Sequence, residues 1–327
     1  MSLASLNNPG LVASAGAAAL AILPVFEELV AAGGISWSKL KIANASVFLV
    51  QVIAVSIPGR LDDQVARAIQ EESDPQNAKG DGDIEQGKSL APVSGRTLVA
   101  PSGWAFAIWG PIFIGEFVFV ASQAMVSSDD ALVPILSKVS VPFIFAHIFQ
   151  TLWTAAFRPK YSGNLMYISC GMLSATAYSL SKAHAAFASA SSMYNFGTYL
   201  KLFAPISMHF GWTTAASLVN LNGAFSMKEL ASSRNIALLG HLSVIAATAI
   251  GTGVTITRSA PVFGGVVTWA LLSVADGMKK RLDNAKIKGN DENASNLLGA
   301  ETQRKLSLAG AVITGIIVTV TTVKILS

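Results

Sequence analysis

The chain has 327 residues, of which 52% are hydrophobic and only 13% are charged, and its mean hydropathy is +0.51. These values exclude an ordinary water-soluble globular domain. The formal net charge of +4 comes from basic residues between apolar runs, which indicates membrane orientation rather than nucleic-acid binding. The single cysteine, Cys170, excludes an internal disulfide and a cysteine-based zinc site.

The N-terminal segment, residues 1–41, is apolar and rich in alanine, but Pro24 and the paired Glu27 and Glu28 interrupt it. It lacks the positively charged start of a secretory signal and the arginines of a transit peptide. Two interpretations therefore stay open for residues 10–32: a helix that spans the membrane, or an apolar helix that lies at its interface.

The first clear span is predicted at 42–58, where an apolar run ends at a proline followed by a glycine. The centre of the next segment, 59–100, is rich in acidic residues, Gly, Ser and Gln and has almost no bulky apolar side chain. It cannot bury enough apolar surface to fold alone, so we expect a disordered polar loop.

Seven further apolar runs are long enough for a helix to cross a bilayer core of about 30 Å. Together with 42–58 they predict an all-α fold, a polytopic transmembrane helical bundle of about eight spans. We expect a core at 101–257 and additional C-terminal helices at 258–327, joined by a basic loop at 279–305. The seven runs are 104–125, 141–157, 164–186, 198–225, 236–256, 261–278 and 306–325.

Basic residues are distributed unevenly between the two sides of this bundle. With eight spans, sixteen of the 23 Lys and Arg fall on one side. The positive-inside rule places that side in the cytosol, or in the matrix or stroma of an organelle. We therefore expect a multi-pass integral membrane protein whose basic loops face one of these compartments.

The stretch Pro101–Val120 combines the features of a spanning helix with a carboxyl group in its interior. Glu116 follows Trp109 by seven residues, so both lie on one helix face. An ionisable residue inside a span is a functional-site hypothesis, and its structural alternative is an acid bonded to a neighbouring helix. Trp104, near the helix end, is either an interfacial anchor or a ligand contact.

Two other predicted spans carry polar and aromatic side chains on one face. The candidates are His147, Gln150 and Trp153 in the run 141–157, and His209, Trp212 and Asn220 in the run 198–225. Their spacing brings the members of each set onto a shared helix face. In the structural interpretation the amides bond between helices and the imidazoles donate to carbonyls; in the functional one the imidazoles ligate a tetrapyrrole metal.

No motif of a soluble enzyme is present. The chain has no phosphate-binding glycine loop, no HExxH and no GxSxG, and Cys170 has no base beside it in the sequence. We therefore expect that the protein is not an enzyme, and a porphyrin or other tetrapyrrole is the one cofactor that the histidines suggest.

Two early motifs resemble the tryptophan-rich sensory proteins, which are related to the TspO/MBR (translocator protein) family. PSGWAFAIWGPIF, which contains Trp104 and Trp109, resembles the second-helix signature of that family. Gln150-Thr-Leu-Trp153 is similar to the family's Asn-x-x-Trp, with Gln in place of Asn.

The resemblance continues in two later helices. Pro205, Trp212 and Asn220 reproduce the family's spacing of proline, glycine-tryptophan, alanine and asparagine. VFGGVVTWALL, which contains Trp269, is similar to a late helix of the longer sensory-type members. The resemblance implies a TspO-like five-helix core with extra helices at both ends.

The resemblance also implies a pocket among the helices for a tetrapyrrole, a sterol or a similar flat apolar molecule. Trp104, Trp109, Trp153, Trp212 and Asn220 occupy motif positions, and Gln150 replaces the motif asparagine. Glu116, His147 and His209 match no family pattern and are candidates from the helix-face argument alone.

The leading hypothesis is a sensor or carrier with a tryptophan-lined intramembrane pocket that binds a planar hydrophobic ligand. One alternative is a secondary transporter that uses Glu116 as its proton-coupling acid. Another is a structural or pigment-associated subunit of a membrane complex, in which the tryptophans only pack. The expected partners are membrane lipid and a hydrophobic small molecule, with a homodimer or membrane-complex partner as a further option, and no nucleic acid.

Overall fold

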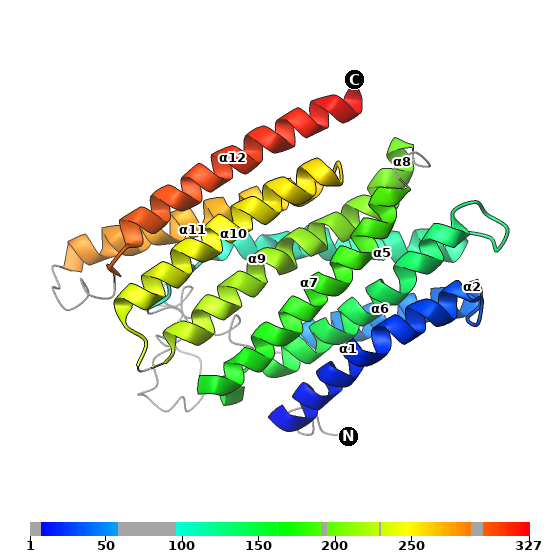
Figure 1. The fold of residues 1–327 in the computed structure, drawn as a ribbon, viewed down its shortest axis with the longest axis horizontal. Helices are drawn as coiled ribbons and strands as arrows, with labels where there is room; N and C mark the ends of the chain where they lie inside the picture. The colour runs from blue at the N-terminus through cyan, green and yellow to red at the C-terminus, as the bar shows by residue number, and fades with distance from the viewer. Residues whose placement is uncertain (1–7, 58–95, 162, 191–194, 229, 289–296) are drawn as a thin grey trace, which may run out of the picture.

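The computed structural model describes residues 8–57, 96–161, 163–190, 195–228, 230–288 and 297–327, whose regular structure is entirely helical (Figure 1). The all-α prediction is therefore confirmed. The long helices in these residues are α1 (Pro9–Ala31), α2 (Trp37–Ser56), α5 (Trp109–Met125), α6 (Val133–Ala156), α7 (Met166–Ser189), α9 (Ala204–Ser226), α10 (Ser233–Thr257), α11 (Pro261–Lys288) and α12 (Ala300–Leu326).

Short helical turns lead into three of these helices. The 3-10 helix η2 (Gly103–Ile108) precedes α5, and η3 (Pro159–Tyr161) and η4 (Gly163–Leu165) precede α7. A short α8 (Phe196–Thr198) and a π-helical turn, η6 (Tyr199–Phe203), precede α9.

Seven helices in the described residues are long and apolar enough to cross a membrane: α1, α2, η2 with α5, α6, α10, α11 and α12. The remaining long helices, α7 and α9, have 24 and 23 residues but are more polar. Many of their polar side chains, such as Thr176 and His209, are fully buried against other helices. Because an interior surface of a membrane bundle can be polar, α7 and α9 fit the expected spans 164–186 and 198–225.

Local sequence signals explain where α1 and α9 begin. The Asn8 side chain accepts hydrogen bonds from the amides of Gly10 and Leu11, which caps α1. Pro205 has no amide hydrogen to donate inside α9, and the chain forms the π-helical turn directly before it. The amide of Ala204 accordingly donates to the carbonyl of Tyr199, five residues earlier.

The helices surround a common interior that is formed by α5, α6 and α9. Helix α6 packs against α1, α2 and α7, and α9 packs against α5, α7, α10 and α11. Helix α12 packs on α10 and α11 and lies at the opposite edge of the bundle from α1 and α2 (Figure 1). Phe119 on α5 contacts Phe143 on α6, with ring centroids 4.8 Å apart.

Helices α2, α6 and α9 end, and α5, α7 and α10 begin, at the same end of the bundle (Figure 1). Arg158, Lys228 and Arg234 lie at this end, which we call the basic end. Helices α2 and α6 therefore run toward the basic end, and α5 runs away from it. The distance of a residue from the basic end can be compared among these three helices.

Several boundaries differ from the prediction. Helix α2 begins at Trp37 instead of near 42, and the indole of Trp37 donates to the Val126 carbonyl at 3.2 Å. Helix α6 begins at Val133 instead of near 141, with Pro142 inside it. Because α11 continues to Lys288 and α12 begins at Ala300, much of the expected basic loop 279–305 is helical.

The expected polar loop 59–100 lies mostly outside the described residues, but its last part packs tightly. Leu98 and Val99 are buried, and the amide of Ser102 donates to the Ser273 carbonyl of α11 at 3.0 Å. Gly277 allows this approach, because a Cβ atom there would lie 2.2 Å from the Ala100 carbonyl oxygen.

Replacement of Gly277 by alanine should therefore destabilise the bundle. We expect Gly277→Ala to lower the free energy of unfolding by about 1–3 kcal/mol, since backbone atoms have to move apart. Gly265→Ala is the matched control on the same helix, because a Cβ atom there has no neighbour within 4 Å. Thermal melting of both variants in detergent checks this, and equal melting temperatures would contradict the packing of 97–102 on α11.

Candidate functional site

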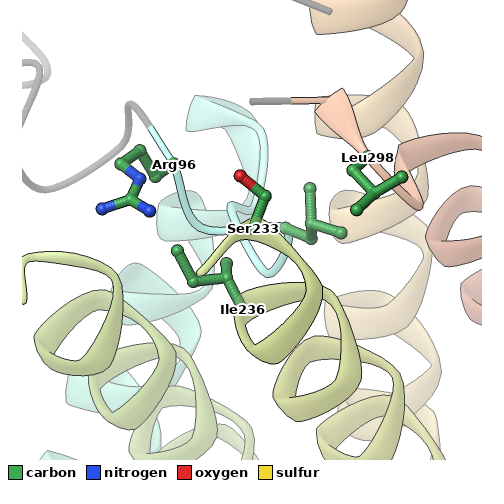
Figure 2. A pocket seen from close by; sticks show the side chains of 5 residues that line it. Arg96, Ser233, Ile236 and Leu298 are labelled. Carbon is green, nitrogen blue, oxygen red and sulfur yellow. The ribbon is translucent and has the colours of Figure 1, made fainter. Parts of the chain in front are cut away.

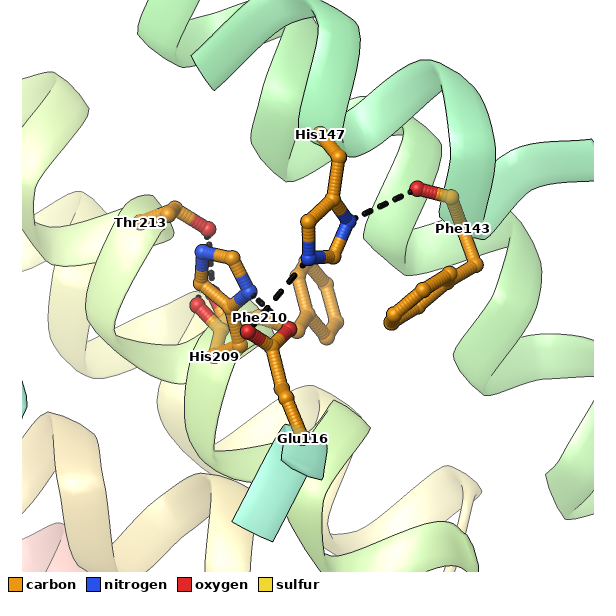
Figure 3. Close-up of polar contacts among 6 residues, drawn as sticks. All are labelled: Glu116, Phe143, His147, His209, Phe210 and Thr213. Carbon is orange, nitrogen blue, oxygen red and sulfur yellow. Dashed lines mark hydrogen bonds and ion pairs between the residues drawn. The ribbon is translucent and has the colours of Figure 1, made fainter. Parts of the chain in front are cut away.

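The carboxyl group of Glu116 lies between two imidazoles in the centre of the bundle (Figure 3). Its Oε1 atom is 2.6 Å from Nδ1 of His209 on α9, and its Oε2 atom is 3.4 Å from Nε2 of His147 on α6. All three side chains have an exposed fraction of 0%. Three helices thus each contribute one ionisable group to a single contact, which we call the Glu116 cluster.

The partners of the imidazoles restrict where protons can lie in the Glu116 cluster. Nδ1 of His147 is 2.9 Å from the Phe143 carbonyl, which can only accept, so this nitrogen carries a hydrogen. In a neutral His147 ring, Nε2 is then a bare acceptor that faces Oε2 of Glu116. That contact is favourable only when a proton lies between the two atoms.

With a neutral His209, two protonation states satisfy this requirement, and both give the cluster no net charge. Either Glu116 is ionised and His147 is an imidazolium, or Glu116 is protonated on Oε2 and both imidazoles are neutral. In both states His209 donates from Nδ1 to Oε1. The arrangement can therefore hold one proton that moves between Glu116 and His147.

The hydrogen bonding of the cluster is incomplete. The 3.4 Å contact between Glu116 and His147 is within ion-pair distance, but neither atom forms a well-aligned hydrogen bond. Nε2 of His209 has no hydrogen-bond partner among the described residues. Because most buried polar groups in proteins are hydrogen-bonded, these atoms mark a place where polar atoms of a ligand or water would be stabilised.

Aromatic rings border the Glu116 cluster on one side. The Trp109 ring meets the His209 ring edge to face, with centroids 5.8 Å apart, and meets the Trp212 ring at 6.2 Å. Phe106 contacts Trp212 at 5.8 Å, and Phe113 stacks on Trp109 at 5.4 Å. The predicted face of α9 with His209 and Trp212 thus meets the predicted face of α5 with Trp109 and Glu116.

Other candidates from the sequence lie apart from this contact. Trp104 donates to Asp276 at 2.9 Å and packs edge to face on Trp269, toward the basic end of α11. Asn220 accepts a hydrogen bond from Ser169 at 3.0 Å, which joins α9 to α7. Asn220 thus forms an interhelical hydrogen bond, the role that its structural interpretation gave it. The bond from Trp104 to Asp276 was not predicted.

Gln150 and Trp153 continue the α6 face beyond His147. Gln150 is fully buried, and neither of its amide atoms has a hydrogen-bond partner in the described part of the chain. Trp153 is buried and stacks on Phe157, and its indole nitrogen is likewise unpartnered within the described residues. The α6 face therefore carries buried polar atoms that have no hydrogen-bond partner within the described residues.

A second buried polar contact was not recognised in the sequence. Nδ2 of Asn44 on α2 donates to Gln123 on α5 at 2.7 Å and to Ser140 on α6 at 2.8 Å. Gln123 and Ser140 each lie seven residues from a member of the Glu116 cluster, Glu116 and His147 respectively. This shared spacing of seven was the signal that could have revealed a second polar layer.

Metal ligation and surface hollows are the remaining possibilities for a site in the described residues. No group of three or more His, Cys, Asp or Glu side chains in the described residues is arranged to hold a metal ion. Arg96, Leu98, Ser233, Ile236 and Leu298 line a shallow hollow at the basic end (Figure 2). Arg96 there donates to the carbonyls of Ser226, Lys228 and Ala231, so it fastens the end of α9.

The fold and the Glu116 cluster define a polytopic helical membrane protein with an ionisable centre between its helices. The family model described as TSPO-like protein matches residues 83–287. This is more than half of the chain, and the chain therefore belongs to the TSPO-like protein family. Searches of curated proteins and of solved structures gave no match.

The family match confirms the resemblance to TspO proteins and places α1, α2 and α12 outside the matched region. The matched region includes α5, α6, α7, α9, α10 and all of α11 except its last residue, so all members of the Glu116 cluster lie within it. Asn44 does not. The protein is a multi-pass integral membrane protein of the TspO type.

The tautomer of His147 can be measured directly. We expect its Nδ1 atom to remain protonated whenever the protein is folded, because the Phe143 carbonyl accepts from it. Nitrogen NMR of isotopically labelled imidazoles, assigned with His147→Gln, reports the hydrogen on each ring nitrogen. An unprotonated Nδ1 in the folded protein would overturn the proton assignment of the cluster.

Proposed function

We propose that this protein is a membrane sensor or carrier that binds a planar hydrophobic ligand, such as a tetrapyrrole or a sterol-like molecule, between its helices. In this proposal Trp109 and Trp212 contact the flat apolar part of the ligand. The Glu116 cluster lies at the end of the site that is nearest the centre of the bundle. The family membership supports a TspO-type bundle, and the contacts of these side chains support the location of the site.

The observation that carries this proposal is the contact between two indoles and a buried, incompletely bonded polar cluster. Binding sites for small molecules are mostly apolar and aromatic, with a few convergent polar groups. Trp109 contacts both Trp212 and His209, whose Nε2 atom is unpartnered in the described residues. That nitrogen is the atom through which an imidazole here would ligate a tetrapyrrole metal.

The charge distribution and the exposed apolar side chains support a placement of the protein in the membrane. Ile114 and Phe117 on α5 are 67% and 63% exposed, as expected for side chains that contact lipid or another membrane subunit. By the positive-inside rule, the basic end faces the cytosol, matrix or stroma. We propose no catalytic activity for the site.

Quenching of tryptophan fluorescence by protoporphyrin IX tests ligand binding. We expect saturable quenching and a weakening of affinity by about threefold to tenfold in Trp212→Phe, because an aromatic contact contributes about 0.5–1.5 kcal/mol. His209→Ala should weaken binding as well. Trp37→Phe is the control, since Trp37 lies at the opposite end and bonds to Val126.

Absence of saturable quenching in the wild-type protein would refute the ligand-binding proposal. A loss of affinity in Trp37→Phe equal to that in Trp212→Phe would show that the indoles act through the fold. Melting temperatures of all variants accompany the titrations, so that a weaker affinity is compared with any loss of stability.

Proton-coupled transport is a second candidate, favoured by the position of Glu116 between two imidazoles. The helices packed on α5 bring His209 to the carboxyl group, and α6 brings His147. The other ionisable side chains on these neighbours lie toward the opposite end of the bundle: Lys39 and Lys41 on α2, Lys138 on α6, and Tyr199 and Lys201 on η6. The proton that moves within the cluster is the chemical basis of this candidate.

Glu116→Gln tests this candidate, because glutamine keeps the side-chain length but cannot release a proton. In vesicles that contain the protein, we expect a pH gradient to drive ligand uptake in the wild type and to have no effect in Glu116→Gln. Equal uptake by both proteins, with the same dependence on pH, would remove proton coupling at Glu116 from consideration.

A further inference from the structure

Gln51 is a fully buried amide in α2 that forms no side-chain hydrogen bond within the described residues. Its exposed fraction is 0%, and neither its Oε1 nor its Nε2 atom has a hydrogen-bond partner among the described residues. A buried amide without partners is costly, because it has lost its bonds to water and gained none. Its position therefore calls for a functional explanation.

The contacts of Asn44 fix which way Gln51 faces. Asn44 bonds to both Gln123 on α5 and Ser140 on α6, so its face of α2 is directed at the junction of those helices. Gln51 follows Asn44 by seven residues and shares its face. The same step leads from Ser140 to His147 and back from Gln123 to Glu116.

These steps bring Gln51 to the level of the Glu116 cluster. Seven residues correspond to about 10.5 Å along each helix axis, and all three steps run toward the basic end. A contact confirms the alignment, since the Phe48 ring on α2 meets the His147 ring with centroids 6.2 Å apart. Gln51 lies one turn beyond Phe48.

Gln150 provides a second unpartnered amide beside this level. It lies three residues beyond His147 and seven beyond Phe143, whose ring packs on Phe119 of α5. Its face is therefore also directed toward α5, and it stands about 4.5 Å closer to the basic end than His147. Two buried, unused amides thus come from α2 and α6 beside the Glu116 cluster.

We infer that Gln51 and Gln150 form a polar subsite for an uncharged hydrogen-bonding group, a hydroxyl or a carboxamide, at the inner end of the ligand. An amide offers both a donor and an acceptor, and such a group is complementary to both. A carboxylate would have to lose its hydration beside a cluster that has no net charge to compensate it. This inference rests on the proposed ligand binding, and it assigns α2, outside the family match, a part in specificity.

Three fluorescent probes that share the pyrene ring and differ in one small substituent test the subsite: pyrenemethanol, its methyl ether and pyrenecarboxylate. Energy transfer from tryptophan to pyrene measures binding to the purified full chain. We expect the alcohol to bind about threefold to tenfold more tightly than the ether, the range that one hydrogen bond supplies. The carboxylate should bind most weakly.

Variants of the two amides locate the preference. Gln51→Leu should reduce the ratio of the affinity for the alcohol to that for the ether, and should leave the affinity for the ether nearly unchanged. In the double variant with Gln150→Leu, the two affinities should be equal. The melting temperature of Gln51→Leu should equal or exceed that of the wild type, since no hydrogen bond is lost. Gln123→Leu is the matched control, because it removes a bond to Asn44 and should lower the melting temperature without changing the ratio.

The outcomes separate this inference from the proposed function. If none of the probes binds saturably, the proposed ligand site itself is refuted. If the probes bind but the alcohol and the ether are equal, or the carboxylate binds best, the subsite is refuted and the ligand site stands. A ratio that falls as much in Gln123→Leu as in Gln51→Leu would also refute the subsite, because the amides would then act through the fold.

Discussion

The structure depends on one costly feature, a carboxyl group buried at the centre of a lipid-spanning bundle. An unpartnered carboxylate there would cost several kcal/mol, and its attraction to a partner repays this only when the geometry is correct. Glu116 obtains its partners from α6 and α9, so these two helices must present His147 and His209 at the same height. The relative positions of three helices are thereby fixed by a single group.

The contacts of Asn44 form a second polar layer, seven residues along α5 and α6 from the Glu116 cluster, which also restricts the relative positions of the helices. Asn44 joins α2, α5 and α6, and no sliding of these helices by one turn can preserve its two hydrogen bonds. These contacts explain how α2, which lies outside the family match, becomes part of the interior of the bundle. They also explain why α7 and α9 can carry many polar side chains, because neighbouring helices and not lipid surround those groups.

The sequence predicted the helices and the faces of α5 and α9 because both follow from periodicity and spacing along one segment. It could not predict that Trp104 bonds to Asp276, since the two residues are 172 positions apart and no motif joins them. Helix ends were missed where polar residues continue a helix past the membrane, as in α11 to Lys288. Gln51 went unrecognised because a lone glutamine in the predicted span 42–58 belongs to no motif.

The complete burial of the Glu116 cluster also controls access to it. Since all three side chains are fully buried, a ligand can reach them only if a helix moves. Separation of α5 from α6 would leave an ionised Glu116 without His147, whereas a carboxyl group protonated on Oε2 loses only a neutral hydrogen bond. The cost of opening the bundle therefore depends on which side of the Glu116–His147 contact holds the proton. In this geometry the opening of the bundle to a ligand is therefore coupled to the transfer of the proton between Glu116 and His147.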